Sequence, residues 1–140
     1  MTTIAYDGRT LAADTQSQTS VLLKMHKLHR LPDGSIFAGS GSAQEVLAVL
    51  AWLRGGDKPG HLNDFEGLIV TPQGTERLGE RLMRVPSLEP FYAIGSGAHF
   101  ALAAMACGKS AVQAVRISAR FDPYTGGRVE SMRIAAKILA

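Results

Sequence analysis

Apolar residues follow two spacings along this chain, one typical of short β-strands and one typical of α-helices. Residues 2–6 (TTIAY) and 9–13 (RTLAA) are β-type runs separated by Asp7-Gly8. An Asp-Gly pair between two such runs predicts a hairpin, because both turn positions accept a positive φ. Turn residues predict two further hairpins, with Pro32-Asp33-Gly34 between KMHKLHRL and SIFAGSG and Pro72-Gln73-Gly74 within FEGLIVTPQGTERLGERL. The runs FYAIGSG and RVESMRIA are expected to form later strands, whereas residues 14–23 show no clear period.

Helical spacing begins at Ser42. The run SAQEVLAVLAWL places apolar residues on one helix face, and Ser42 with Glu45 predicts a capping box at its start. The stretch GGDKPGHLNDF that follows is expected to be a loop. Two later runs predict further helices, HFALAAMACG (99–108) and SAVQAVRISARF (110–121), the second with Ser110 as N-cap.

The order of these elements indicates the fold class. Strands come in hairpins and helices come in blocks, which argues for an α+β protein with antiparallel sheets and against alternating βαβ units. The 140 residues fit a single domain, residues 1–140, and are enough to bury a sizeable core.

Composition excludes several function classes. The net charge is +3, and the Lys and Arg residues are scattered without a run or aromatic interleaving, so we expect a solvated surface and no nucleic-acid partner. No stretch approaches the ~20 apolar residues of a membrane span, so no membrane partner is expected. Because no signal peptide opens the chain, we expect a cytoplasmic protein.

Cysteine and histidine usage indicates neither a disulfide framework nor a metal site. Cys107 is the only cysteine, and its helical apolar run predicts a small buried core residue. The histidines at positions 26, 29, 61 and 99 show no metal-ligand spacing with carboxylates and are assigned to surface or core. No cofactor is therefore expected.

Two glycine turns lie between a strand and a helix. Gly39-Ser40-Gly41 has three readings: a nucleotide loop, a tight turn, or backbone N–H groups directed at a developing oxyanion. Gln44 stands where a dinucleotide loop would need its third glycine, which argues against the first reading. In Gly95-Ser96-Gly97, Ser96 is expected either to cap the following helix or to relay a proton.

The start of the chain raises the question of its nucleophile. If Met1 is removed, Thr2 carries a hydroxyl and a free α-amine on one residue. A threonine hydroxyl is a poor nucleophile near neutral pH and needs an adjacent base, which this amine would supply. If Met1 stays, the same residues are an ordinary N-terminal strand.

Six features in order resemble the proteasome β-subunit family and the related bacterial self-compartmentalising proteases, which are N-terminal-nucleophile (Ntn) hydrolases. They are a Thr-Thr-Ile start, an Ala-Asp pair after the first hairpin, a lysine before the second, a Gly-x-Gly before a long helix, the segment AIGSG before an alanine-rich helix, and DPYTGG in place of an Asp-x-x-Ser-Gly-Gly loop. The resemblance implies an α+β fold, a four-layer αββα sandwich of two antiparallel sheets. It also implies a threonine-type peptidase without a cofactor.

The resemblance assigns roles by position around the nucleophile. Thr2 would attack after loss of Met1, which methionine aminopeptidase normally removes before a small residue such as threonine. Lys27 matches the family lysine, with Lys24 as a rival, and Asp14 matches the aspartate that keeps that lysine charged. Such an ammonium would lower the pKa of the α-amine by like-charge repulsion.

The remaining roles concern the oxyanion and the α-amine. Gly41 matches the oxyanion glycine, with Gly39 as the alternative. Ser96, Asp122 and Thr125 match residues that tune the amine and position water. By family analogy, Ser20, Val21 and Ala43 would line a substrate pocket.

The chain is short for this family. Only a loop follows the helix that ends near Leu53, where relatives usually carry a second long helix, so one helical layer is expected to be reduced and apolar sheet surface left for a partner chain. The expected partners are a peptide or unfolded-protein substrate and further copies in a homo-oligomer, as a ring or stacked ring. An ATPase unfoldase is compatible with the resemblance but not indicated. Two alternatives stay open: a non-catalytic structural or assembly subunit of the same fold, and an Ntn amidase for small amides.

Overall fold

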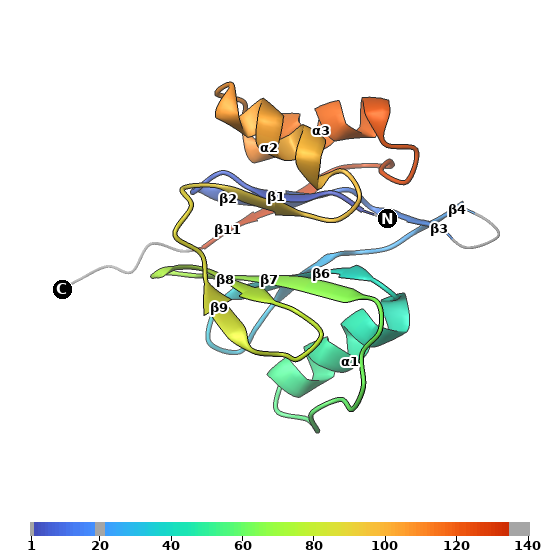
Figure 1. Cartoon of the computed structure of the whole chain (residues 1–140), viewed down its shortest axis with the longest axis vertical. Coiled ribbons are helices and arrows are strands. Elements are labelled where there is room, and N and C mark those ends of the chain that lie inside the picture. Colours follow the sequence, from blue (N-terminus) through green and yellow to red (C-terminus); the bar gives the residue numbers. More distant parts are fainter. Residues whose placement is uncertain (1, 19–21, 135–140) are drawn as a thin grey trace.

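A computed structural model describes residues 2–18 and 22–134 of the 140-residue chain. Its elements form four layers, with two helices over one sheet, a second sheet behind it, and a third helix on the far side (Figure 1). The predicted α+β sandwich of two antiparallel sheets is confirmed. Among the described residues, no helix combines the length and apolar content needed to cross a membrane.

Each large sheet is antiparallel throughout. The four-stranded sheet has the order β10 (Tyr92–Ile94), β1 (Ile4–Tyr6), β2 (Thr10–Ala13) and β11 (Glu130–Arg133). The five-stranded sheet has the order β5 (Leu28–Arg30), β6 (Ile36–Gly41), β7 (Phe65–Thr71), β8 (Gly74–Leu78) and β9 (Arg84–Pro86). The chain therefore enters the four-stranded sheet at its start and returns to it only after the five-stranded sheet is complete.

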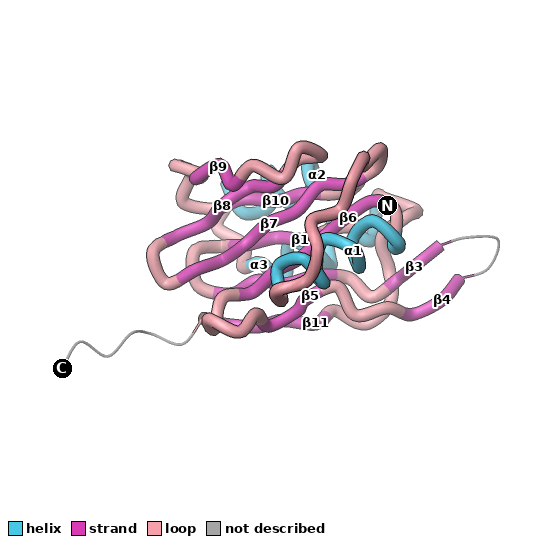
Figure 2. Tube along the Cα trace, turned by 90° about the horizontal axis from the view of Figure 1, so that it is seen from below, coloured by secondary structure: helices cyan, strands magenta, loops and turns pink. Residues whose placement is uncertain are grey.

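The three predicted hairpins are present, as β1–β2, β5–β6 and β7–β8. Sequence analysis missed a small hairpin of β3 (Gln16–Gln18) and β4 (Leu22–Lys24), which extends beyond the edges of the large sheets (Figure 2), and the edge strand β9. Each of these strands has only three residues, so its pairing depends on the partner strand more than on an apolar pattern of its own.

Alternating side chains bury both faces of each large sheet. In β1, Ile4 faces the other sheet while Ala5 faces the helices, and in β6 the aromatic ring of Phe37 points the opposite way from Ile36. A period of two sends successive side chains to opposite faces, so an apolar run of this kind fits a strand buried on both sides.

Alanine lines the helix-covered face of the four-stranded sheet. The helices are α2 (Ala98–Ala106) and α3 (Ala111–Phe121), and seven of the nine buried residues in this layer are alanines. Small side chains let the helix and sheet backbones approach closely. The packed helices thereby hold the loop before α2, which contains Ser96, and the loop after α3, which contains Asp122. Ser110 caps α3 as predicted and forms a capping box with Gln113.

The opposite layer holds a single helix, α1 (Ala43–Leu53), so the expected reduction of one helical layer is observed in the described residues. Part of the face that a second helix would cover is closed by the chain itself, because Leu62 and Leu82 come from loops and are buried in the same cluster. Leu82 adopts a positive φ of 59° to do so.

Two local predictions were wrong. The predicted capping box is absent: Ser42 is the N-cap of α1 but its side chain makes no capping hydrogen bond, and the Glu45 carboxylate instead accepts from the backbone N–H groups of Asn63 and Asp64. Cys107 is exposed, because α2 ends at Ala106 and the cysteine lies beyond the face that contacts the sheet.

Candidate active site

The backbone of Thr2, two residues before β1, is held at both its N–H and its carbonyl group. Its N–H donates to Ser96 Oγ (2.9 Å), and its carbonyl accepts from the Gly97 N–H (3.1 Å). Gly95 allows this close approach, since a Cβ there would come within 2.2 Å of the Thr2 carbonyl oxygen. The side chain of Thr2 thereby has a fixed direction in a residue that is only 2% exposed.

Lys27 and Asp14 form a buried ion pair at the Thr2 hydroxyl. Lys27 Nζ lies 2.8 Å from Asp14 Oδ1 and also donates a hydrogen bond to Thr2 Oγ1. Asp14 follows β2 directly, and its carboxylate also accepts from the backbone N–H groups of Thr3 (3.1 Å) and Gly126 (3.0 Å). These additional hydrogen bonds matter because a buried ion pair is favourable only when its remaining lone pairs and N–H groups also have hydrogen-bond partners.

The charge state of Lys27 reflects two opposing effects. Burial lowers the pKa of the Lys27 ammonium, because removal from water disfavours the charged form. Asp14, through its charge and its hydrogen bond, opposes this effect, and Glu130 and Asp122 do so from farther away. The net pKa lies below the ordinary lysine value, so this amine is less firmly protonated than a surface lysine.

A second hydrogen-bonded group surrounds the Thr2 nitrogen. Ser96 Oγ, which accepts from that nitrogen, donates to Asp122 Oδ2 (2.6 Å), and Thr125 Oγ1 donates to the same oxygen (2.7 Å). Burial alone would raise the pKa of Asp122, but the bonds from Ser96 and Thr125 outweigh it and hold that pKa below its usual value. Asp122 is thus an ionised acceptor that is connected to the Thr2 nitrogen through the Ser96 hydroxyl.

The structure excludes one of the two predictions for Ser96, and its role as a proton relay stays a prediction. The N-cap of α2 is Gly97 and no side chain caps that helix, so Ser96 is not a capping residue. Its hydroxyl links Thr2 to Asp122, as a relay would require.

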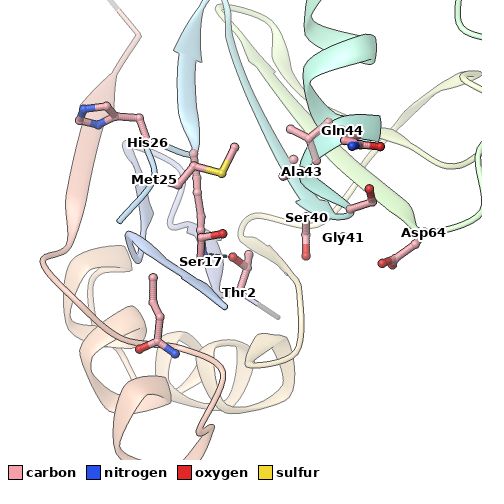
Figure 3. Close-up of a pocket in the computed structure, with 14 residues that line it drawn as sticks. Thr2, Ser17, Met25, His26, Ser40, Gly41, Ala43, Gln44 and Asp64 are labelled. Atoms are coloured by element: carbon pink, nitrogen blue, oxygen red, sulfur yellow. Dashed lines mark hydrogen bonds between the residues drawn. The ribbon is translucent and has the colours of Figure 1, made fainter. Parts of the chain in front are cut away.

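Gly41 lies at the end of β6, facing Thr2 across a pocket of about 320 Å³ (Figure 3). Its φ is +111°, and a Cβ would meet the Asp64 carbonyl oxygen at 2.1 Å, so only glycine fits here. Gly39 also lines the pocket but lies within the strand, paired with Gly67. Gly41 therefore makes the tight turn that was one of the predictions for this motif. That the Gly41 N–H stabilises an oxyanion stays a prediction.

The same pocket contains the predicted lining residue Ala43. Met25, Ser17 and Thr2 lie on one side of it, and Ala43, Gln44 and Asp64 lie on the other side (Figure 3). Ser20 and Val21, which were also predicted to line it, lie outside the described residues. The pocket thus offers apolar and polar walls next to a hydroxyl.

The structure brings together all seven residues assigned by position: Thr2, Asp14, Lys27, Gly41, Ser96, Asp122 and Thr125. Lys24, the rival of Lys27, is exposed on β4, so Lys27 is the lysine at the hydroxyl. Within residues 2–18 and 22–134, no group of three or more His, Cys, Asp or Glu side chains is arranged to hold a metal.

Sequence analysis missed three glutamates that hold the backbone next to these residues. Glu130 accepts from the N–H groups of Lys27 and Leu28, and Glu66 accepts from that of Gly95. Glu45 accepts from the N–H groups of Asn63 and Asp64, and Asp64 lies against Gly41. Their only sequence signal is a carboxylate within or beside an apolar run, which is too common to single them out.

Comparisons with known proteins identify the fold of this arrangement as proteasome-like. No family model and no curated protein matches the sequence. The structure is similar to Thiobacillus denitrificans BPH, alone and in complex with epoxomicin, with a TM-score of 0.74 and 24% identity over 96% of this chain and 98% of that one. It is also similar to eukaryotic HslV from Trypanosoma brucei, with a TM-score of 0.67 and 18% identity over 94% of this chain and 97% of that one.

Proposed function

We propose that this protein is a threonine-type peptidase that uses Thr2 as its nucleophile after removal of Met1. The hydrogen bonds of Thr2 are the main support for this proposal. Its hydroxyl accepts a hydrogen bond from the Lys27 ammonium, and its backbone N–H donates one to Ser96 Oγ. An N-terminal nucleophile needs both groups held in this way. Similarity to the fold of HslV and of a protein that binds epoxomicin supports the same reading.

The proposed reaction begins at the freed α-amine. This amine accepts the proton of Thr2 Oγ1 through a water while Oγ1 attacks the peptide carbonyl, and the Lys27 ammonium keeps the amine neutral by like-charge repulsion. The Gly41 N–H stabilises the oxyanion, a contribution typically worth ~3–4 kcal/mol. The amine then returns the proton to the leaving amine as the C–N bond breaks, which gives an ester on Oγ1. Water hydrolyses the ester, and Ser96, Asp122 and Thr125 orient the amine for this second step.

The proposal includes assembly. The substrate is a peptide or unfolded protein, and the chain acts as a homo-oligomer, in a ring or stacked ring, in the cytoplasm. Sedimentation velocity of the processed protein tests this part, and a monomer at micromolar concentration would contradict it. No observation calls for an ATPase unfoldase.

Intact mass, measured before and after incubation with epoxomicin, tests the nucleophile. The expected result is loss of Met1 and a one-to-one adduct that is absent from Thr2→Ala. Retained Met1 without an adduct would instead support a non-catalytic subunit of the same fold. An adduct combined with hydrolysis of small amides but not of peptides would support the amidase alternative.

A further inference from the structure

Lys27 reaches Thr2 from a segment that belongs to no strand. β5 begins at Leu28, so strand pairing does not fix the backbone at Lys27 itself. A lysine has a long flexible side chain, and ordering it costs conformational entropy. The position of its ammonium therefore depends on a separate anchor for the Lys27 backbone.

Glu130 provides this anchor from the other sheet. Its Oε1 accepts from the N–H of Lys27 (2.5 Å) and from the N–H of Leu28 (3.0 Å), while its Oε2 lies 2.8 Å from His26 Nδ1. The glutamate side chain is 19% exposed, so these bonds are partly shielded from water. One carboxylate thus spans the three residues 26–28.

The location of Glu130 in its own sheet strengthens this connection. On β11 it lies opposite Ala13 of β2, the residue directly before Asp14. Asp14 holds the ammonium of Lys27, and Glu130 holds its backbone, from neighbouring positions of adjacent strands. Both ends of the lysine are therefore anchored to the four-stranded sheet, whose strand β1 follows Thr2 in the chain.

We propose that Glu130 is a positioning residue for Lys27, whose carboxylate holds residues 27 and 28 where the lysine ammonium reaches Thr2 Oγ1. This inference rests on the proposed function, in which that contact is required for reaction. A displacement of about 1 Å of such a group can lower a rate about 100-fold.

Glu130 also acts on Lys27 through its charge. The charged groups that act on Lys27 are Asp14 after β2, Glu130 on β11 and Asp122 after α3. His26, on the same segment as Lys27, contacts Glu130, and the processed protein adds the α-amine of Thr2. Geometry and charge can be separated by two variants. Glu130→Gln keeps the length and one acceptor oxygen but loses the charge, whereas Glu130→Asp keeps the charge but is too short to reach both N–H groups.

The test measures the rate and affinity of epoxomicin labelling as a function of pH. Glu130→Asp is expected to lower the maximal labelling rate about 10-fold or more, with little change in the concentration for half-maximal rate. Glu130→Gln is expected to retain most of that rate near neutral pH, with its alkaline limb moved to lower pH. Glu76→Gln, which removes a carboxylate paired with Arg84 on the exposed side of β8, is the matched control and should match wild type.

A [13Cε]lysine NMR titration gives a readout that does not depend on turnover. The Lys27 signal is assigned with Lys27→Arg, and it is expected to move toward that of an exposed lysine in Glu130→Asp but not in Glu76→Gln. Wild-type labelling rate and an unchanged Lys27 signal in Glu130→Asp would overturn the proposal. If wild type itself forms no adduct, the proposed function fails, and the Lys27 signal alone then decides whether Glu130 positions this lysine.

Discussion

Lys27 Nζ lies 2.8 Å from Asp14 Oδ1, and the two side chains are 7% and 1% exposed. Each charge stabilises the other at this depth, because an isolated buried charge is strongly disfavoured. The pair is therefore both a structural element and the source of the positive charge at the Thr2 hydroxyl.

Lys27→Ala is expected to abolish epoxomicin labelling while the protein still folds. The fold survives because Asp14 keeps its bonds from the Thr3 and Gly126 N–H groups, but loss of one partner of a buried pair should lower the free energy of unfolding by about 3 kcal/mol. Intact mass and urea unfolding measure the two effects. Lys24→Ala is the control, and a loss of labelling in that variant would assign the wrong lysine here.

Gly41→Ala is expected to remove activity and to destabilise the protein. The new Cβ would lie 2.1 Å from the Asp64 carbonyl oxygen, so the backbone at the pocket must move. Gly34→Ala offers a comparison, because Gly34 also has a positive φ (+87°) but no atom within 4 Å of the added Cβ. That variant should show only the cost of the left-handed conformation, about 1–2 kcal/mol, and normal labelling. Equal effects of the two substitutions on labelling would contradict the role of Gly41.

Ser96→Ala is expected to slow labelling about 100-fold with little loss of stability, because the link between the Thr2 nitrogen and Asp122 is lost. Ser110→Ala should do the reverse. It removes the cap of α3, at a cost of about 1 kcal/mol in unfolding free energy, and leaves the labelling rate unchanged. If labelling rates and melting temperatures fall together in both variants, Ser96 acts only through stability.

Ala43→Leu is expected to weaken binding of peptide epoxyketones that carry a bulky side chain next to the epoxyketone. Ala43 lines the pocket of about 320 Å³ that contains Thr2, and a larger side chain would fill part of it. The concentration for half-maximal labelling should rise for the bulky probe and change less for a probe with a small side chain. An equal change for both probes would place the probe side chain elsewhere.

Asp7 is expected to make stability depend on acid pH. Burial raises the pKa of its carboxyl, but backbone N–H groups of Ala111, Thr10 and Arg9 outweigh this and lower it below the model-peptide value of 3.8. With the folded pKa below the unfolded one, the stabilisation is fully present above the unfolded pKa and is lost as pH falls through the folded pKa.

Asp7→Asn should therefore lower stability at neutral pH and flatten the decline below pH 3.8, the unfolded value. Thermal melts from neutral to strongly acid pH measure both effects. A parallel decline in wild type and variant would show that Asp7 does not contribute to the acid sensitivity.

Local signals predicted much of the fold. The Asp7-Gly8 turn, the other two hairpin turns and the Ser110 cap are set within a few residues of chain, and each lies where the sequence predicts it. The β3–β4 hairpin and β9 were missed because three-residue strands take their conformation from pairing. Likewise, the exposure of Cys107 depends on which face of α2 meets the sheet.

The resemblance predicted the residues of the candidate site and the pairing of Lys27 with Asp14, but not the wider set of contacts that holds them. Lys24 and Lys27 are three residues apart, and only the folded backbone shows which one reaches Thr2. The bonds from Glu130 to the Lys27 segment join positions more than 100 residues apart. Contacts of this range follow from the packing of two sheets, which no short sequence window contains.

The path of the chain through the four-stranded sheet also has a consequence for timing during synthesis. Asp14 and Lys27 emerge from the ribosome long before Gly126 and Glu130, yet both depend on these late residues for hydrogen bonds. The slow, non-local pairing of β11 with β2 must therefore come before the contacts around Thr2 are complete. A nascent or prematurely released chain that ends before Gly126 would leave both the Asp14 carboxylate and the Lys27 backbone without these partners. Under the proposed function, such fragments would be inert, and the Thr2 hydroxyl would become reactive only in a finished molecule.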